Sequence, residues 1–177
     1  GGMAYTFLKA TGKSIGSSLC EEERLQTARE LLIQAEKSGV EIILPVDSVV
    51  ADQFNASANT QIVSSDSMPD GWMGLDIGPL SIQKAKKALQ GCKTILWNGP
   101  MGVFEMSAFA TGTFEVARSI AEETKSGAFS LIGGGDSAAA IEKAGLSEAV
   151  SYVSTGGGAL LEYLEGKTLP GIAALQN

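Results

Sequence analysis

Apolar residues recur at helical spacing near the start of the chain. They stand three or four positions apart from Leu25 to Ala35, and Gly39 follows where a glycine commonly ends a helix. Upstream, Ser18 and Glu21 have the spacing of a capping box. The pattern predicts a helix that is capped at Ser18 and ends before Gly39.

The next apolar run is too short for a helix and rich in branched residues. It covers residues 41–46 and ends at Asp47, so it predicts a buried strand. Residues 49–51 and 61–63 predict two further short strands, on either side of a polar, turn-rich stretch at 55–59.

The remainder of the chain repeats a unit of helix, strand and glycine turn. Helices are predicted at 80–90 and 113–126, from the glycine turn at 133–136 through Lys143, and at 159–164, and strands at 94–97, 129–132 and 150–153. Such alternation favours a parallel sheet with right-handed crossovers. We therefore expect an α/β protein with a doubly wound, mainly parallel sheet and helices on both faces, a Rossmann-like three-layer sandwich.

Composition narrows the class of protein. With 177 residues, 44% of them hydrophobic and 19% charged, the chain fits one domain over residues 1–177. The net charge of −7 and the scatter of 13 lysines and arginines argue against nucleic acid as a partner. No apolar run approaches the ~20 residues of a membrane span, so we expect no membrane association and a soluble, intracellular protein.

Several kinds of chemistry are excluded or disfavoured within this chain. It has no histidine, which excludes Ser-His-Asp triads and histidine-bound zinc. Cys20 and Cys92 form no CxxC pair, so we expect two reduced thiols. Neither the GxxxxGK[ST] motif of P-loop proteins nor the GxGxxG fingerprint of nicotinamide-binding domains occurs.

Four glycine turns follow a strand or a strand-like position. Glycine admits positive φ there and lets backbone N–H groups approach a ligand, while the next helix N-terminus attracts phosphate. For any single turn, tight packing is an equally ordinary explanation, but four such turns favour a phosphorylated ligand. They are Gly1-Gly2, Asn98-Gly99-Pro100, Gly133-Gly134-Gly135 and Gly156-Gly157-Gly158.

Two carboxylates beside these turns each allow two interpretations. Asp136 leads from a glycine turn into a helix, where it could act as an N-cap, as a magnesium ligand beside nucleotide phosphates, or as both. Ser137 adds a hydroxyl next to it. Glu105 is either an ordinary surface residue or an acceptor for two ribose hydroxyls.

Five segments resemble the signature segments of the phosphoglycerate kinase family, and they occur along the chain in the order that the family has. The run WNGPMGVFE at residues 97–105 is very specific, and the resemblance continues to LPGI at 169–172. The other segments are GGMAYTF at 1–7, LDIGP at 75–79, GGGDS at 133–137 and STGGGA at 154–159.

The resemblance implies a two-domain kinase with a hinge between its domains. Such an enzyme transfers a phosphoryl group between 1,3-bisphosphoglycerate and ADP, giving 3-phosphoglycerate and ATP. The amino-terminal domain would bind the phosphoglycerate, and the carboxy-terminal domain, represented by this chain, would bind Mg²⁺ with ADP or ATP. We expect a monomer in the cytoplasm or in the plastid stroma.

The resemblance also implies a role for particular residues. The base and ribose would contact Gly1, Gly2, Gly78, Leu80, Pro100, Val103 and Glu105. The phosphates would contact Asn98, Gly134, Gly135, Asp136 and Ser137, with Asp136 on Mg²⁺. The phosphoryl group in transfer would meet the amides of Gly156, Gly157 and Gly158, the catalytic set.

The chain departs from the family pattern in two respects. Ser137 stands where threonine is commoner, which keeps the hydroxyl. The larger difference is that parts of the family pattern lie outside this sequence. These parts are the first strand, a lysine-bearing segment before Gly1, and the substrate domain with its arginines. We expect a fragment that binds nucleotide and is inactive alone, because phosphoryl transfer depends on those cations.

Two other classes of function stay open on the residues alone. A nucleotide-binding module without catalysis would use the same turns for regulation or assembly. A dinucleotide dehydrogenase domain would bind NAD, although its fingerprint is missing.

Overall fold

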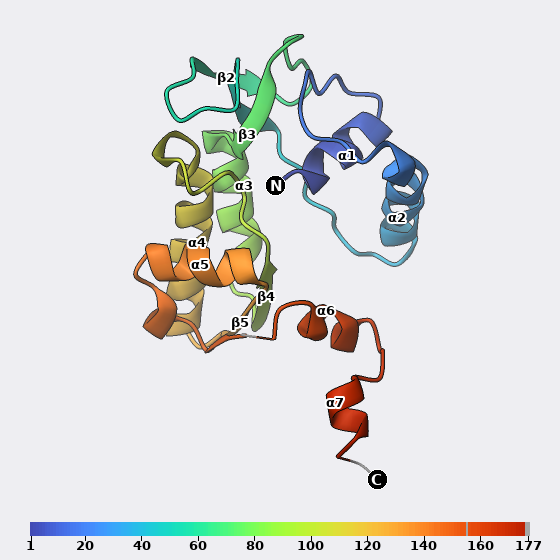
Figure 1. The fold of residues 1–177 in the computed structure, drawn as a ribbon, viewed down its shortest axis with the longest axis vertical. Coiled ribbons are helices and arrows are strands. Elements are labelled where there is room, and N and C mark those ends of the chain that lie inside the picture. The colour runs from blue at the N-terminus through green and yellow to red at the C-terminus, as the bar shows by residue number, and fades with distance from the viewer. Residues whose placement is uncertain (155, 176–177) are drawn as a thin grey trace. The chain divides into compact units, whose positions relative to one another are not determined.

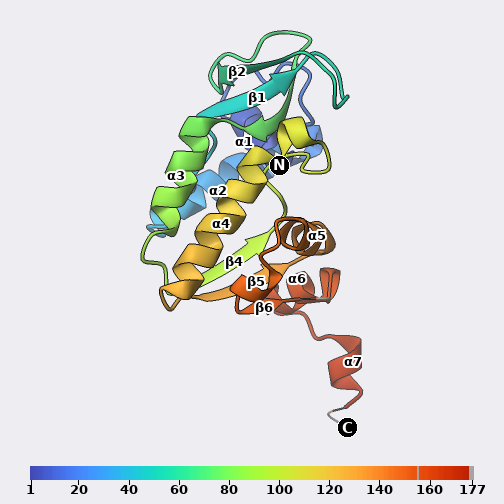
Figure 2. The same ribbon diagram turned by 90° about the vertical axis from the view of Figure 1, so that its left-hand side faces the viewer.

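The computed structural model describes residues 1–154 and 156–175. The chain forms two compact units (Figures 1 and 2). The first unit consists of Gly1–Ala88 and Met101–Val116, and the second of Leu89–Pro100 and Ala117–Asn177. The chain therefore passes between the units three times, after residues 88, 100 and 116.

The first unit contains a three-stranded antiparallel sheet. Its strands are β1 (Asp47–Ala51), β2 (Thr60–Ser64) and β3 (Met73–Ile77), in the order β2-β1-β3. Figure 2 shows β2 beside the central strand β1. The strands predicted at 49–51 and 61–63 are confirmed within β1 and β2. Their antiparallel pairing was not expected from the alternation of strands and helices.

The helices of the first unit come before and after this sheet in the sequence. They are α1 (Met3–Ala10), a 3₁₀ turn at Glu22–Arg24, α2 (Leu25–Lys37), α3 (Pro79–Leu89), a 3₁₀ turn at Ser107–Phe109 and the start of α4 (Thr111–Lys125). One buried cluster joins Tyr5 and Leu8 of α1 to Ile15, Val50 and Met68. Burial of these apolar side chains fixes α1 against the sheet.

The predicted capping box at Ser18 is wrong. The α-helix begins at Leu25, and among the described residues no side chain caps it. Ser18 is buried, and its hydroxyl oxygen accepts a hydrogen bond from the Gly74 N–H at 2.9 Å. A contact 56 positions away in the sequence therefore takes the hydroxyl that local spacing assigned to the helix. The predicted end of the helix is confirmed, because Gly39 follows it with φ +67°.

The strand predicted at 41–46 is also wrong. In the part of the chain that the structure describes, these residues pair with no strand, and β1 begins only at Asp47. Ile42 and Val46 keep 36% and 40% of their surface exposed. A run of branched residues becomes a strand only where a neighbouring strand completes its hydrogen bonds.

The second unit contains a three-stranded parallel sheet. Its strands are β4 (Thr94–Asn98), β5 (Phe129–Gly133) and β6 (Tyr152–Val153), in the order β4-β5-β6. All three strands were predicted, although β6 is shorter than the expected 150–153. Side chains alternate along β4, where Ile95 and Trp97 are buried between exposed neighbours.

The helices of the second unit follow its strands. They are the later part of α4, then α5 (Gly135–Lys143), a 3₁₀ turn at Ser147–Ala149, α6 (Gly158–Leu164) and α7 (Pro170–Ala173) (Figure 1). Ile132 of β5 and Ile141 of α5 are fully buried. The α/β class is confirmed. Among the described residues no helix combines the length and apolar character that a bilayer crossing needs.

Candidate functional site

Three of the four predicted glycine turns begin at one edge of the parallel sheet. Asn98 ends β4 and is paired with Gly133, which ends β5. The Ser154 N–H donates to the Ile132 carbonyl at 2.8 Å, so the segment after β6 starts beside β5. Since parallel strands end at the same edge, the turns after β4, β5 and β6 lie together, as the sequence predicted.

The turn after β5 leads directly into α5. Gly134 is the N-cap of this helix, with φ +86°, a conformation that glycine adopts readily. The side chain of Asn98 lies against the turn, because a Cβ on Gly134 would stand 2.7 Å from its Oδ1. Gly135 faces open space among the described residues. The turn therefore carries open backbone and one amide side chain at a helix N-terminus.

The interpretation of Asp136 as an N-cap is wrong. Gly134 holds the cap position, and Asp136 lies in the first turn of α5 with an exposed side chain. A carboxylate in the first turn still interacts favourably with the helix dipole. The carboxylate is thus not engaged in a cap, and its position at the turn remains compatible with a bound cation.

Ser137 connects two of the turns. It is fully buried, and its Oγ accepts a hydrogen bond from the Gly99 N–H at 2.6 Å. Gly99 itself has φ +98° in the turn after β4. The hydroxyl therefore holds the Asn98-Gly99-Pro100 turn against α5, a contact that the sequence did not indicate.

The turn after β6 contains the three glycines predicted to be catalytic. Gly157 is the N-cap of α6, and the Gly156 N–H donates to the Ser154 Oγ at 3.2 Å. A Cβ on Gly157 or Gly158 would meet no described heavy atom within 4 Å. The space beside these two glycines is therefore open, and Gly158 is exposed. The neighbouring Thr155 lies outside the described residues.

In the first unit, Gly78 and Leu80 stand at the start of α3 beside the buried Asp47. The two carboxylate oxygens of Asp47 accept the N–H groups of Leu80, at 2.9 Å, and Ser81, at 2.7 Å. A Cβ on Gly78 would overlap this carboxylate. Asp47 thus caps α3 from a distant strand, and the Leu80 side chain, 59% exposed, is left at the surface.

The segment from Met101 to Glu105, which contains the predicted Val103 and Glu105, is held through its backbone. The Thr113 Oγ1 accepts the N–H groups of Met101 and Gly102, each at 3.1 Å. The Val103 N–H donates to the Leu75 carbonyl of β3 at 2.9 Å. This arrangement leaves the side chain of Glu105 exposed.

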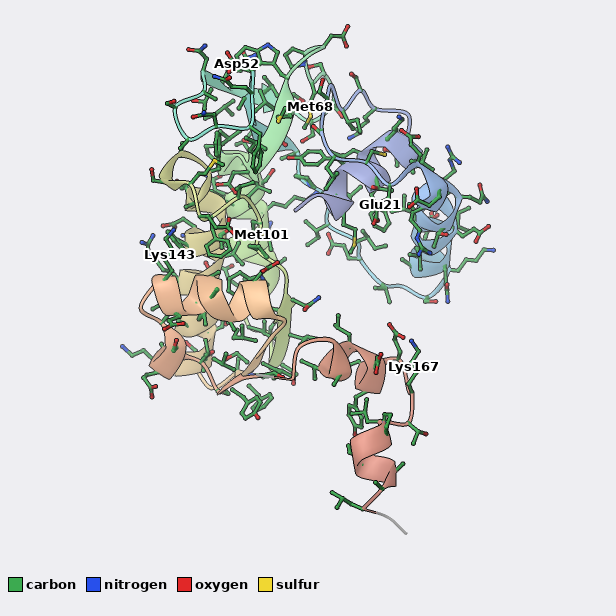
Figure 3. The ribbon with its side chains drawn as sticks, viewed as in Figure 1. Glu21, Asp52, Met68, Met101, Lys143 and Lys167 are labelled. Carbon is green, nitrogen blue, oxygen red and sulfur yellow. The ribbon has the colours of Figure 1, made fainter. Side chains whose placement is uncertain are left out.

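Gly1 lies beside that segment. Its nitrogen donates to the carbonyl of Met101 at 2.9 Å, and Met101 is labelled in Figure 3. Gly2 precedes α1, and a Cβ there would stand 2.7 Å from the Leu19 side chain. The structure therefore brings Gly1 next to the segment that contains Val103 and Glu105.

A second buried carboxylate, Asp76, lies behind the same segment. Its oxygens accept the N–H groups of Gly112 at 2.8 Å and of Ile77 at 2.9 Å. Burial raises the pKa of Asp76 to about 6, although the two backbone hydrogen bonds counteract part of that rise. A Cβ on Gly102 or Gly112 would overlap the carboxylate.

The predicted residues divide between the units. Gly1, Gly2, Gly78, Leu80, Val103 and Glu105 belong to the first unit, and Asn98, Pro100, Gly134, Gly135, Asp136, Ser137, Gly156, Gly157 and Gly158 to the second. Sequence analysis did not single out the three buried side chains that hold the site backbone, which are Asp47, Asp76 and Thr113. Asp76 lies inside the LDIGP segment, where a carboxylate next to apolar strand residues was an available signal.

The predicted residues do not line the hollow of about 560 Å³ in the second unit. That hollow lies between α4 and residues 146–150, and its charged lining consists of Arg118, Glu122, Lys125 and Glu148. These two cations and two anions balance, so the hollow offers no net attraction to a phosphate group.

Comparison with known proteins identifies the family. The family model "Phosphoglycerate kinase" matches residues 1–167. A phosphoglycerate kinase of Thermosynechococcus vestitus is 56% identical over 177 residues, which are 100% of this chain and 44% of that protein. A chloroplastic phosphoglycerate kinase of Volvox carteri is 58% identical over 175 residues, 99% of this chain and 38% of that protein.

A solved structure has the same fold. The structure of phosphoglycerate kinase from Coxiella burnetii superposes with a TM-score of 0.92 at 45% identity, over 98% of this chain and 44% of that one. The chain thus spans less than half the length of these relatives. Because the family model covers residues 1–167 and the relatives align along essentially the whole sequence, the chain belongs to the phosphoglycerate kinase family.

Proposed function

We propose that this chain is the nucleotide-binding part of a phosphoglycerate kinase. The enzyme would transfer a phosphoryl group reversibly between 1,3-bisphosphoglycerate with ADP and 3-phosphoglycerate with ATP. The observation that carries the proposal is the gathering of three glycine turns at the carboxyl edge of the parallel sheet. Family membership supports the same assignment.

In the second unit, the turn before α5 would hold the nucleotide phosphates. The N–H groups of Gly134 and Gly135 stand at a helix N-terminus, where backbone donors and the helix dipole favour an anion. Two side chains border this turn. They are Asn98 and Ser137, and the Ser137 hydroxyl holds the neighbouring Gly99. Pro100, at the end of the neighbouring turn, would contact the base and ribose.

A Mg²⁺ ion bound with the nucleotide would be held by Asp136. The residues present fit such an ion, because Mg²⁺ in nucleotide sites takes one or two carboxylates and completes its shell with phosphate oxygens and water. Asp136 supplies one exposed carboxylate. The ion would supply neutralisation of phosphate charge.

In the first unit, Gly1, Gly2, Gly78, Leu80 and Val103 would contact the base, and Glu105 would accept hydrogen bonds from the ribose hydroxyls. Two observations support this role. Leu80 and Glu105 expose their side chains, and the backbone near them is fixed by buried groups. A fixed backbone lowers the entropy that binding would otherwise cost.

The amides of Gly156, Gly157 and Gly158 would meet the phosphoryl group during transfer. Open backbone at Gly157 and Gly158 supports this role. The phosphoglycerate would bind to a domain outside this sequence, and the whole enzyme would act as a monomer in the cytoplasm or plastid stroma. Without that domain's cations, the chain alone should bind Mg-ADP but not turn over.

Calorimetry with Mg-ADP and a coupled kinase assay on the 177-residue chain test these statements. We expect saturable ADP binding and no turnover. Efficient turnover by the chain alone would show that no further domain is needed. Binding of NAD in preference to ADP would favour a dehydrogenase domain, and ADP binding by a complete protein that has no kinase activity would favour a non-catalytic module.

Asp136→Asn tests the magnesium assignment. Since Asp136 lies in the first turn rather than at the cap, the substitution should lower stability by less than about 1 kcal/mol. It should raise the Mg²⁺ concentration needed for half-maximal ADP binding several-fold, because a neutral amide replaces an anionic ligand. An unchanged Mg²⁺ dependence would remove Asp136 from the proposed site.

A further inference from the structure

One buried hydroxyl fixes the segment that would contact the ribose. Thr113 lies in the first turn of α4 and has no exposed surface. Its Oγ1 accepts two successive backbone amides, those of Met101 and Gly102, each at 3.1 Å. A hydroxyl oxygen has two lone pairs, so both are used by this one segment.

Two further hydrogen bonds join the segment to its own unit. The Val103 N–H donates to the Leu75 carbonyl, and the Gly1 nitrogen donates to the Met101 carbonyl, both at 2.9 Å. The Phe104 N–H donates to the Gly102 carbonyl at 2.9 Å and the Met106 N–H to the Val103 carbonyl at 3.0 Å, which shapes the turn of the segment. Thr113 therefore provides two of the four hydrogen bonds just described that join the segment to the rest of the unit.

The position of Thr113 is itself fixed. The preceding residue, Gly112, donates its N–H to the buried carboxylate of Asp76 at 2.8 Å. Gly102 packs against the same carboxylate, since a Cβ there would overlap it. The start of α4 and the segment are thus both held against Asp76, and the Thr113 hydroxyl sets their register.

We propose that Thr113 is a positioning residue for nucleotide binding, whose hydroxyl holds the Met101–Glu105 backbone so that Glu105 meets the ribose. This inference rests on the proposed function. Thr113 is fully buried and does not touch the ligand; it acts through the amides of Met101 and Gly102. The effect of its loss should fall on the ribose and base and spare the phosphates.

The test compares Thr113→Val with Thr113→Ser in the complete enzyme that contains this chain. Valine keeps the shape of threonine and removes the acceptor, whereas serine keeps the acceptor. We expect Thr113→Val to raise the KM for ADP about tenfold and to leave the KM for 1,3-bisphosphoglycerate unchanged, because two partly buried backbone amides lose their partner. Thr113→Ser should stay within about twofold of the parent enzyme.

Two probes separate positioning from general damage. The parent enzyme should prefer ADP to 2′-deoxy-ADP, and Thr113→Val should reduce that preference several-fold, because Glu105 no longer meets the ribose accurately. Inhibition by inorganic tripolyphosphate, which has neither base nor ribose, should not change. Thr124→Val is the matched control: it removes a hydroxyl from the same helix whose partners are the Ile120 carbonyl and Ser130, and it should leave every KM unchanged.

The outcomes decide between distinct failures. If Thr113→Val keeps the parent KM for ADP and the parent ribose preference, or if both KM values rise together with no change in ribose preference, the positioning role is wrong. If Thr113→Val does not fold, Thr113→Ala takes its place, since it leaves room for a water molecule to serve both amides, and the same two outcomes overturn the role. A parent enzyme that fails to bind ADP would instead overturn the proposed function.

Discussion

In the first unit, three glycines lie where a side chain would collide with a buried carboxylate. A Cβ on Gly78 would overlap Asp47, and a Cβ on Gly102 or Gly112 would overlap Asp76. Each carboxylate accepts backbone amides from the same neighbourhood. These glycines permit close packing of backbone against a buried anion.

In the second unit, three glycines of the proposed phosphate turns have the opposite surroundings. A Cβ on Gly135, Gly157 or Gly158 would meet no described heavy atom within 4 Å. Packing does not explain glycine at these three positions, which leaves backbone conformation and access by a ligand. At Gly157, where φ is +50°, both backbone conformation and access by a ligand favour glycine.

The difference shows that glycine serves two physical purposes among the predicted site residues. In the first unit, the missing side chain of glycine lets a buried carboxylate pack against the backbone, which holds that backbone in place. In the second unit, no described side chain or backbone fills the space beside Gly135, Gly157 and Gly158. A base and a ribose need a fixed surface, whereas a phosphate needs open donors, so each arrangement suits the part of the ligand that we propose for its own unit.

Gly112→Ala should disrupt the packing of backbone against Asp76 and should have the largest effect on stability. The added methyl group would overlap the Asp76 carboxylate and the Ile77 side chain, so we expect a loss of about 3 kcal/mol in the free energy of unfolding. Gly135→Ala, also in the first turn of a helix, is the control and should change stability by less than about 0.5 kcal/mol. Equal stabilities of the two variants in denaturant titration would contradict the contrast between the units.

The ionisation of Asp76 should make stability depend on pH. Its pKa of about 6 in the folded protein lies above the ordinary value of 3.8, so the folded state binds this proton more tightly than the unfolded state. The contribution to stability is fully present below about pH 4 and is lost as the pH rises through 6, by roughly 2 to 3 kcal/mol. Asp76→Asn should remove this dependence.

Denaturant unfolding of both proteins at pH 4 to 7 isolates the effect of Asp76. The unfolding free energy of the parent minus that of Asp76→Asn should fall by roughly 2 to 3 kcal/mol as the pH rises, because only the parent loses stability with ionisation of this group. A difference that stays constant from pH 4 to pH 7 would mean that Asp76 does not titrate in this range.

The sequence predicted well the parts of the fold that local spacing determines. The strand at 94–97, the strand at 129–132 and the helix at 113–126 each have their periodicity and their glycine stop within one short segment. The strand at 41–46 was predicted wrongly because a strand depends on a partner, which no local pattern supplies. Ser18 was misassigned for a similar reason, since its partner is Gly74.

The candidate site was predictable to the same extent. The turns that follow parallel strands could be placed at one edge, because strand direction follows from the alternation with helices. The groups behind the site could not, since Asp47 is bonded to Ser81, Asp76 to Gly112 and Thr113 to Met101. Each pair is at least 12 residues apart in the sequence, so only the folded chain shows which amides the buried groups contact.

Gly157→Val tests the open arrangement of the second unit. In the complete enzyme it should lower turnover by well over ~10-fold while ADP affinity changes by less than ~1 kcal/mol, because the amides of this turn would act mainly on the transition state. Since φ is +50° at Gly157, valine also strains the turn, and Gly158→Ala adds bulk without that positive φ. Parallel losses of thermal stability, ADP affinity and turnover in Gly157→Val would show that the glycine only permits the turn.

The smallest expected effect concerns Glu105, which the fixed backbone of the first unit would present to the ribose. An ionised carboxylate accepts stronger hydrogen bonds than a neutral amide, so Glu105→Gln should weaken ADP binding by about 1 kcal/mol. The matched ligand is an ADP analogue that lacks both ribose hydroxyls. It should bind the parent and the variant equally, because the hydrogen bonds in question are absent from both complexes. A loss of the same size with the analogue would mean that Glu105 acts on some other part of the nucleotide. In that case no side chain of the first unit would be assigned to the ribose, and the proposed division of the ligand between the two units would be wrong for the sugar.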